Sequence, residues 1–133
     1  MQNVDRTKSI EELEASAWPH DPYPSRLVQE CQRLRKVALA NLSVEELRML
    51  IGQKIGLHYV VPVALERLQA NPLSAGDFYA GDLLVNLLAV PDDYWASHPA
   101  ENNAVVELAV ELRQIHDLLA TEVLPAISRF GYR

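Results

Sequence analysis

Four histidines and one cysteine are the side chains of this 133-residue sequence best suited to hold a metal ion or to act as a nucleophile. No two histidines are three or four residues apart, and the sequence contains neither H-E-x-x-H nor C-x-x-C, the patterns that gather zinc ligands. Cys31 falls on the apolar face of an expected helix, which favours a buried small hydrophobe over a reactive thiol. We therefore predict no metal, no other cofactor and no enzyme activity. The histidines are His20, His58, His98 and His116.

Glu107 and Glu111 are carboxylates one helical turn apart on an expected helix. Such a pair could hold a cation, which leaves a carboxylate-based metalloenzyme with a helical core as one alternative. The E-x-x-H partner that carboxylate bundles use is missing from the sequence. A solvated acidic face is the better interpretation.

Residues 77–95 combine carboxylates with aromatic side chains on expected loops. Aromatic rings give a large contact area at low entropic cost, and carboxylates attract basic groups of a partner. This composition is typical of a protein-binding surface, although the aromatic residues could equally fill gaps between helices. The candidate binding residues are Asp77, Tyr79, Asp82, Asp92, Asp93, Tyr94 and Trp95.

The charge balance narrows the choice of partner. The chain has 12 Lys and Arg against 18 Asp and Glu, a formal net charge of −6. Phosphate neutralisation needs a basic face, so direct nucleic-acid binding is not expected. A basic protein partner is compatible with this charge.

The length and the hydrophobic fraction of 49% suit a single domain over residues 1–133, with disorder expected in residues 1–8. No apolar run reaches the roughly 18 residues of a membrane helix. The first residues contain no apolar signal core, so a cytoplasmic protein is expected.

Helix boundaries are marked by capping residues. Ser9 with Glu12, and Ser43 with Glu46, form the S-x-x-E pattern of a capping box. The first box predicts a helix over residues 10–17. The second predicts a helix that turns Leu47, Leu50 and Ile51 inward, and Ser25 is an N-cap for the helix between them.

A glycine-containing elbow interrupts the apolar stretch 47–68. Gly56 suits a helix C-cap with positive φ, and Pro62 suits the first turn of a new helix. Asn71-Pro72 should end that helix, and Asp82 should cap the next one.

The strongest helix signal covers residues 100–121, where apolar residues recur every three and four positions. Pro125 should kink or restart this helix. No stretch alternates convincingly as a strand would, so we predict an all-α bundle of about five to seven helices. The repeating residues are Val105, Leu108, Leu112, Ile115 and Leu119.

The string LRMLIGQKIGLHYVVPVALERL, followed by NPLSAGDFYAGDLL, resembles immunity proteins of bacterial contact-dependent growth inhibition (CDI) systems. KSIEELE and RLVQECQRLRK upstream resemble the same family, so the similarity covers about residues 8–90. In the family's pattern a proline often precedes the second Gly-Asp, where this sequence has Ala80.

The resemblance implies a cytosolic, non-enzymatic antitoxin that binds the toxic C-terminal domain of a cognate effector, often a nuclease. On this hypothesis the candidate residues of 77–95 cover the toxin's basic active site or substrate groove. A monomer that forms a one-to-one complex is expected. A helical adaptor or regulatory module with an unrelated protein partner is the alternative.

Overall fold

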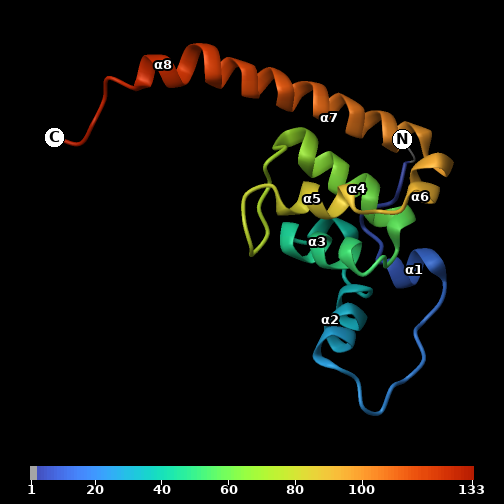
Figure 1. The fold of residues 1–133 in the computed structure, drawn as a ribbon. Helices are drawn as coiled ribbons and strands as arrows, with labels where there is room; N and C mark the ends of the chain where they lie inside the picture. Colours follow the sequence, from blue (N-terminus) through green and yellow to red (C-terminus); the bar gives the residue numbers. More distant parts are fainter. Residues whose placement is uncertain (1–2) are drawn as a thin grey trace.

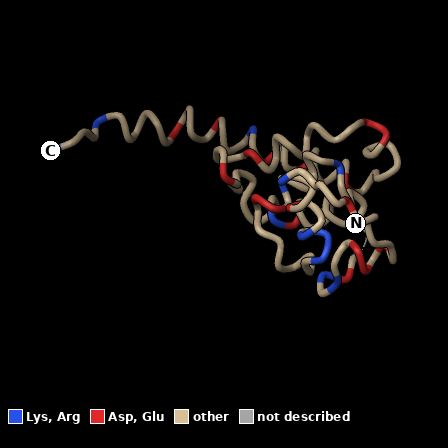
Figure 2. Tube along the Cα trace, turned by 90° about the horizontal axis from the view of Figure 1, so that it is seen from below, with Lys and Arg blue, Asp and Glu red and all other residues tan. Residues whose placement is uncertain are grey.

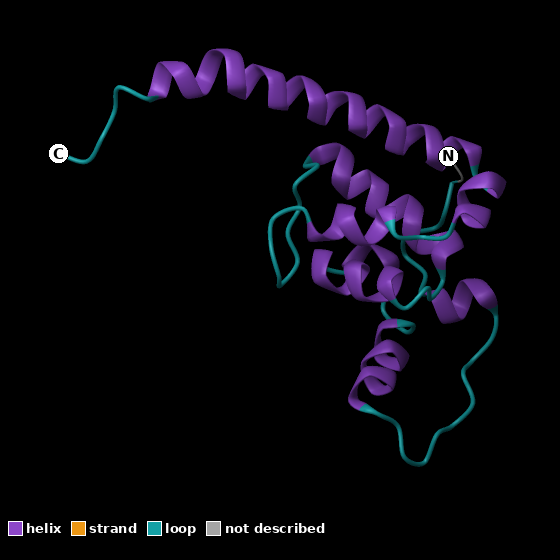
Figure 3. Ribbon diagram, in the orientation of Figure 1, coloured by secondary structure: helices purple, strands orange, loops and turns teal. Residues whose placement is uncertain are grey.

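The computed structural model describes residues 3–133, and every regular element in that range is helical (Figure 1). Helices and loops account for the described chain, apart from two isolated β-bridges between loop residues (Figure 3). Because α7, η2 and α8 join into one rod, the described chain has seven separate α-helices, which confirms the all-α prediction. The elements are α1 (Ile10–Glu14), α2 (Arg26–Leu34), η1 (Leu39–Asn41), α3 (Val44–Gly52), α4 (Leu57–Ala70), α5 (Asp82–Leu88), α6 (Asp92–Ser97), α7 (Pro99–Leu118), η2 (Leu119–Val123) and α8 (Leu124–Ile127).

Both predicted capping boxes are confirmed. The Ser9 hydroxyl accepts the backbone N–H of Glu12, and the Glu12 carboxylate accepts the N–H of Ser9. Ser43 and Glu46 make the same reciprocal pair at the start of α3. The helix expected over residues 10–17 ends earlier, at Glu14, because Ala15 takes a left-handed conformation with φ 51°.

The elbow between α3 and α4 differs from the prediction at two residues. Gly56 has φ 60° but precedes α4 as its N-cap instead of closing α3. The expectation that Pro62 lies in the first turn of its helix is wrong, because α4 starts at Leu57 and Pro62 lies in its second turn. Pro62 cannot donate a hydrogen bond to the carbonyl of His58. Its ring is buried, and that burial offsets part of the loss of a ladder hydrogen bond.

α3, α4 and α5 pack on one another to form the centre of the core. The predicted inward residues of α3 are buried, and so is Cys31. The segment before α1 joins this core: Val4 is buried, and the carbonyl of Lys8 accepts the N–H of Leu39. Of residues 1–8, for which disorder was expected, residues 1–2 lie outside the described chain.

α7 crosses the compact part of the molecule over α4 and then continues beyond it, together with η2 and α8 (Figure 1). The helix predicted over residues 100–121 therefore runs from Pro99 to Ile127, with a π-helical turn, η2, just ahead of Pro125. Pro125 has no N–H to offer the carbonyl of Thr121. The expected disturbance at Pro125 is present as this widened turn and not as a break.

Candidate protein-binding surface

Asp82 organises the loop between α4 and α5. Its carboxylate accepts backbone N–H groups of Gly76, of Phe78 at 3.1 Å and of Tyr79 at 3.4 Å. Burial alone would raise the pKa of Asp82, but these three donors and the charge of Arg48 hold it below its ordinary value. The side chain is 1% exposed. Asp82 therefore shapes the loop from inside, and it is neither the surface contact nor the simple helix cap that the sequence suggested.

Glu45 and Arg48 of α3 hold the same loop from the other side. A Glu45 oxygen accepts the backbone N–H of Asp77 at 3.1 Å, and both Glu45 oxygens pair with the Arg48 guanidinium. The guanidinium carbon lies 4.5 Å from the centre of the Phe78 ring. The side chains at the tip stay exposed on this fixed backbone. We call Leu73, Asp77, Phe78 and Tyr79 the loop tip.

α6 carries the other half of the predicted site. Asp92 and Asp93 are exposed, while Tyr94 and Trp95 are partly buried against the core. The Trp95 indole N–H donates to the carbonyl of Val90 at 3.0 Å. Burial and the nearby charge of Glu101 raise the pKa of Tyr94. Tyr94 and Trp95 thus fill gaps between helices, the alternative that the sequence left open for aromatic residues.

The structure does not bring the predicted residues into one patch. The loop tip precedes α5 and α6 follows it, and the two lie on opposite sides of the compact part (Figure 1). Acidic and basic segments alternate over that part, whereas the protruding rod carries few charges (Figure 2). The exposed carboxylates among the predicted residues therefore lie at two separate places, Asp77 on the loop tip and Asp92 with Asp93 on α6.

Exposed apolar side chains continue along the rod beyond the compact part of the molecule. Ile115 and Leu119, the last two residues of the predicted helical repeat, are 39% and 42% exposed. Only the first half of the repeat packs against the domain, where Leu108 is buried. Apolar residues continue to recur beyond residue 121, the predicted end of the helix. This continuation was the sequence signal that could have revealed the exposed surface. We call Ile115, Leu119, Val123 and Ile127 the apolar stripe.

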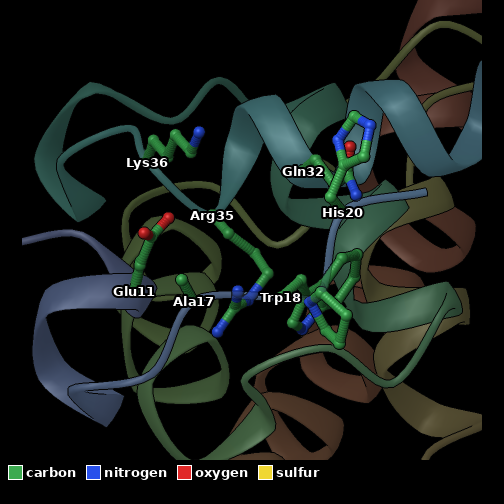
Figure 4. Close-up of a pocket in the computed structure, with 8 residues that line it drawn as sticks. Glu11, Ala17, Trp18, His20, Gln32, Arg35 and Lys36 are labelled. Atoms are coloured by element: carbon green, nitrogen blue, oxygen red, sulfur yellow. The ribbon is translucent and has the colours of Figure 1, made fainter. Parts of the chain in front are cut away.

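A cavity of about 190 Å³ lies between the loop after α1 and the end of α2 (Figure 4). Arg35, 2% exposed, donates to the carbonyl of Ser16 at 3.0 Å, and its guanidinium lies 4.7 Å from the centre of the Trp18 ring. Glu11 and Lys36 bring opposite charges to the lining. The Arg35 guanidinium also lies 3.5 Å from a carboxylate oxygen of Glu14, so Arg35 links the loop to both α1 and α2. The lining therefore combines one carboxylate with the basic side chains of Arg35 and Lys36.

His58 and His98 approach each other, with 3.2 Å between Nδ1 of His58 and Nε2 of His98. Sequence spacing missed this pair because only the packing of α4 against the start of α7 brings them together. Within residues 3–133, no group of three or more His, Cys, Asp or Glu is placed to hold a metal ion. Glu107 and Glu111, the pair considered for a cation site, are exposed.

None of the helices described over residues 3–133 combines the length and apolar character needed to span a bilayer. The comparison with curated proteins and the comparison with solved structures each returned no match. The family model described as CDI immunity proteins matches residues 12–105, more than half of the chain. The match covers the capping box of α3, the glycine elbow and the loop tip. The chain belongs to the family of CDI immunity proteins.

Proposed function

We propose that this protein binds the toxin domain of a cognate CDI effector and neutralises it by occlusion, without catalysing a reaction. The family match over residues 12–105 is the observation that carries this proposal. The proposed toxin is a nuclease, and the proposed place of action is the cytoplasm, where nucleic-acid substrates lie. Covering the active site or the substrate groove of the toxin would exclude those substrates.

The apolar stripe and the loop tip are the proposed contact surface. Large exposed apolar patches on soluble proteins mark interaction sites. The rod protrudes on the side of the molecule where the loop tip lies (Figure 1). Phe78 is 69% exposed on a backbone fixed by Asp82, so it would lose little conformational freedom on binding.

The carboxylates have a separate proposed role. Asp77 belongs to the loop tip, and Asp92 with Asp93 forms a second exposed acidic site on α6. A nuclease presents basic groups to phosphates, and these carboxylates would attract the same groups. Tyr79 is the proposed aromatic anchor beside Asp77. Tyr94 and Trp95 instead hold α6 on the core.

Co-expression with the toxin domain encoded beside this gene tests the function. Growth rescue and a one-to-one complex on gel filtration are expected. Growth arrest despite well-expressed folded protein would refute neutralisation of that toxin, and it would leave the helical adaptor as the alternative.

Two matched substitutions on α7 and η2 test the surface. Leu119→Glu changes the apolar stripe. Val110→Glu changes a residue of similar exposure, 45%, that lies on about the opposite face of the same rod. Loss of complex formation in the first variant alone is expected. Equal affinity for both variants would exclude the stripe as the contact surface.

A further inference from the structure

His58 and His98 form a pair that the proposed toxin surface does not use. His58 lies in the first turn of α4, and His98 lies between α6 and α7. Their facing ring nitrogens are 3.2 Å apart, and the ring centres are 5.5 Å apart. The His58 side is exposed, so small ions can reach it from solvent.

The hydrogen bonds of His98 fix which of its nitrogens carries a proton. Nδ1 of His98 lies 2.8 Å from the carbonyl oxygen of Tyr94. A carbonyl can only accept, so Nδ1 is the protonated nitrogen. In the neutral ring, Nε2 therefore has a free lone pair, and this lone pair faces His58. An imidazole whose other N–H donates to a carbonyl is the usual arrangement of a metal-binding histidine.

The surroundings also fix the orientation of the His98 ring. The Tyr94 ring stacks on it with 3.9 Å between centres and an interplanar angle of 11°. The Ser97 hydroxyl lies 3.1 Å from Nδ1. A preoriented ligand loses little rotational freedom when an ion binds.

We propose that Nε2 of His98 and Nδ1 of His58 together bind a divalent transition-metal ion of the Zn²⁺, Ni²⁺ or Cu²⁺ class. Imidazole nitrogen is the ligand type that these ions share. Two nitrogens bound to tetrahedral zinc at about 2.0–2.1 Å lie about 3.3 Å apart, close to the separation found here. Since no third His, Cys, Asp or Glu of residues 3–133 joins the pair, water would complete the coordination.

Binding requires one proton to move on His58. Without metal, Nδ1 of His58 carries the hydrogen that is donated to Nε2 of His98. When the ion binds, that proton returns through solvent to Nε2 of His58, and both facing lone pairs bind the ion. The proton only changes its position on His58, so this step itself releases none.

The ion would link the start of α4 to the junction from which α7 leaves the domain. α7 packs on α4 and then carries the apolar stripe outward. A bond between the two helix starts would stiffen the base of this rod. The metal site does not depend on the identity of the toxin.

Calorimetric titration of the full chain with ZnCl₂ tests the proposal. The wild type and His116→Ala should bind one ion with the same affinity, since His116 lies far along α7 beside Asp117. His58→Ala and His98→Ala should each lose saturable binding. No saturable binding by the wild type, or binding that survives both substitutions, would overturn the proposal.

Thermal unfolding supplies a second readout on the same four proteins. Zinc should raise the melting temperature of the wild type and His116→Ala only, because an ion that binds the folded state stabilises it. Magnesium, which prefers oxygen ligands, should leave all four unchanged. Circular dichroism checks that the two alanine variants fold; a folded His98→Ala protein that zinc still stabilises would refute the site.

Discussion

Gly56 lies directly against the side chain of Ile10: a Cβ at Gly56 would stand 2.9 Å from Cδ1 of Ile10. This contact seats α1 on the elbow between α3 and α4, and Ile10 is fully buried there. The backbone at Gly56 has φ 60°, so the position combines a left-handed conformation with close packing.

Gly56→Ala should therefore lower the free energy of unfolding by about 2–5 kcal/mol, the sum of left-handed strain and overpacking. Gly81→Ala is the matched control, because Gly81 also has positive φ but a Cβ there meets its nearest atom at 3.7 Å. Gly81→Ala should lower the free energy of unfolding by only about 1–2 kcal/mol. Urea unfolding measures both, and equal losses would show that the contact with Ile10 contributes nothing.

The ionised Asp82 carboxylate should make the free energy of unfolding depend on pH in the acidic range. Its pKa in the folded state lies below the ordinary value. Its contribution is therefore fully present above the unfolded pKa of about 3.9 and is lost as the pH falls through the folded pKa. Asp82→Asn should lose about 1–3 kcal/mol at pH 7, with a smaller difference from wild type at pH 3.

Urea unfolding from pH 7 to pH 3 checks this expectation. Asp92→Asn, at an exposed position, should change stability by less than about 0.5 kcal/mol. A constant difference between Asp82→Asn and wild type across this range would contradict the role of the charge.

Removal of residues 119–133 should separate stability from toxin binding. Every side chain in this segment is exposed, so the truncated protein should unfold within about 1 kcal/mol of the full chain. Affinity for the toxin should fall, since the segment carries three of the four residues of the apolar stripe. Binding calorimetry beside urea unfolding measures the two effects, and unchanged affinity would place the toxin elsewhere on the molecule.

Charge reversal at the two acidic sites should act on the association rate. Asp77→Lys, and separately the double change of Asp92 and Asp93 to Lys, should slow toxin binding on the order of tenfold at low salt. The difference should shrink as salt screens the charges. Stopped-flow association at several salt concentrations measures this effect. If the Asp92 and Asp93 variant keeps its affinity and salt dependence, α6 is not part of the site.

The sequence was informative where a signal is local. Ser9 with Glu12 and Ser43 with Glu46 specify helix starts within one turn, so the structure confirms them. The prediction for Pro62 failed because the burial of apolar surface along α4 outweighs the local preference of proline for the first turn of a helix. Asp82 and the histidine pair depend on contacts across the fold, which helical spacing cannot reveal. Periodicity identified Ile115 and Leu119 as apolar helix residues but cannot tell whether a neighbouring helix covers them.

The π-helical turn has a consequence for the shape of the rod. Stripe residues four apart drift around a regular helix, since one turn takes only 3.6 residues. A π-helical turn takes more residues than an α-helical turn, so η2 offsets part of this drift between Leu119 and Val123. The chain can therefore lose or gain a residue near Thr121 by narrowing or widening a single turn. Such a change in length would alter how far the apolar stripe extends from the compact part of the molecule, while the stripe keeps its face of the rod.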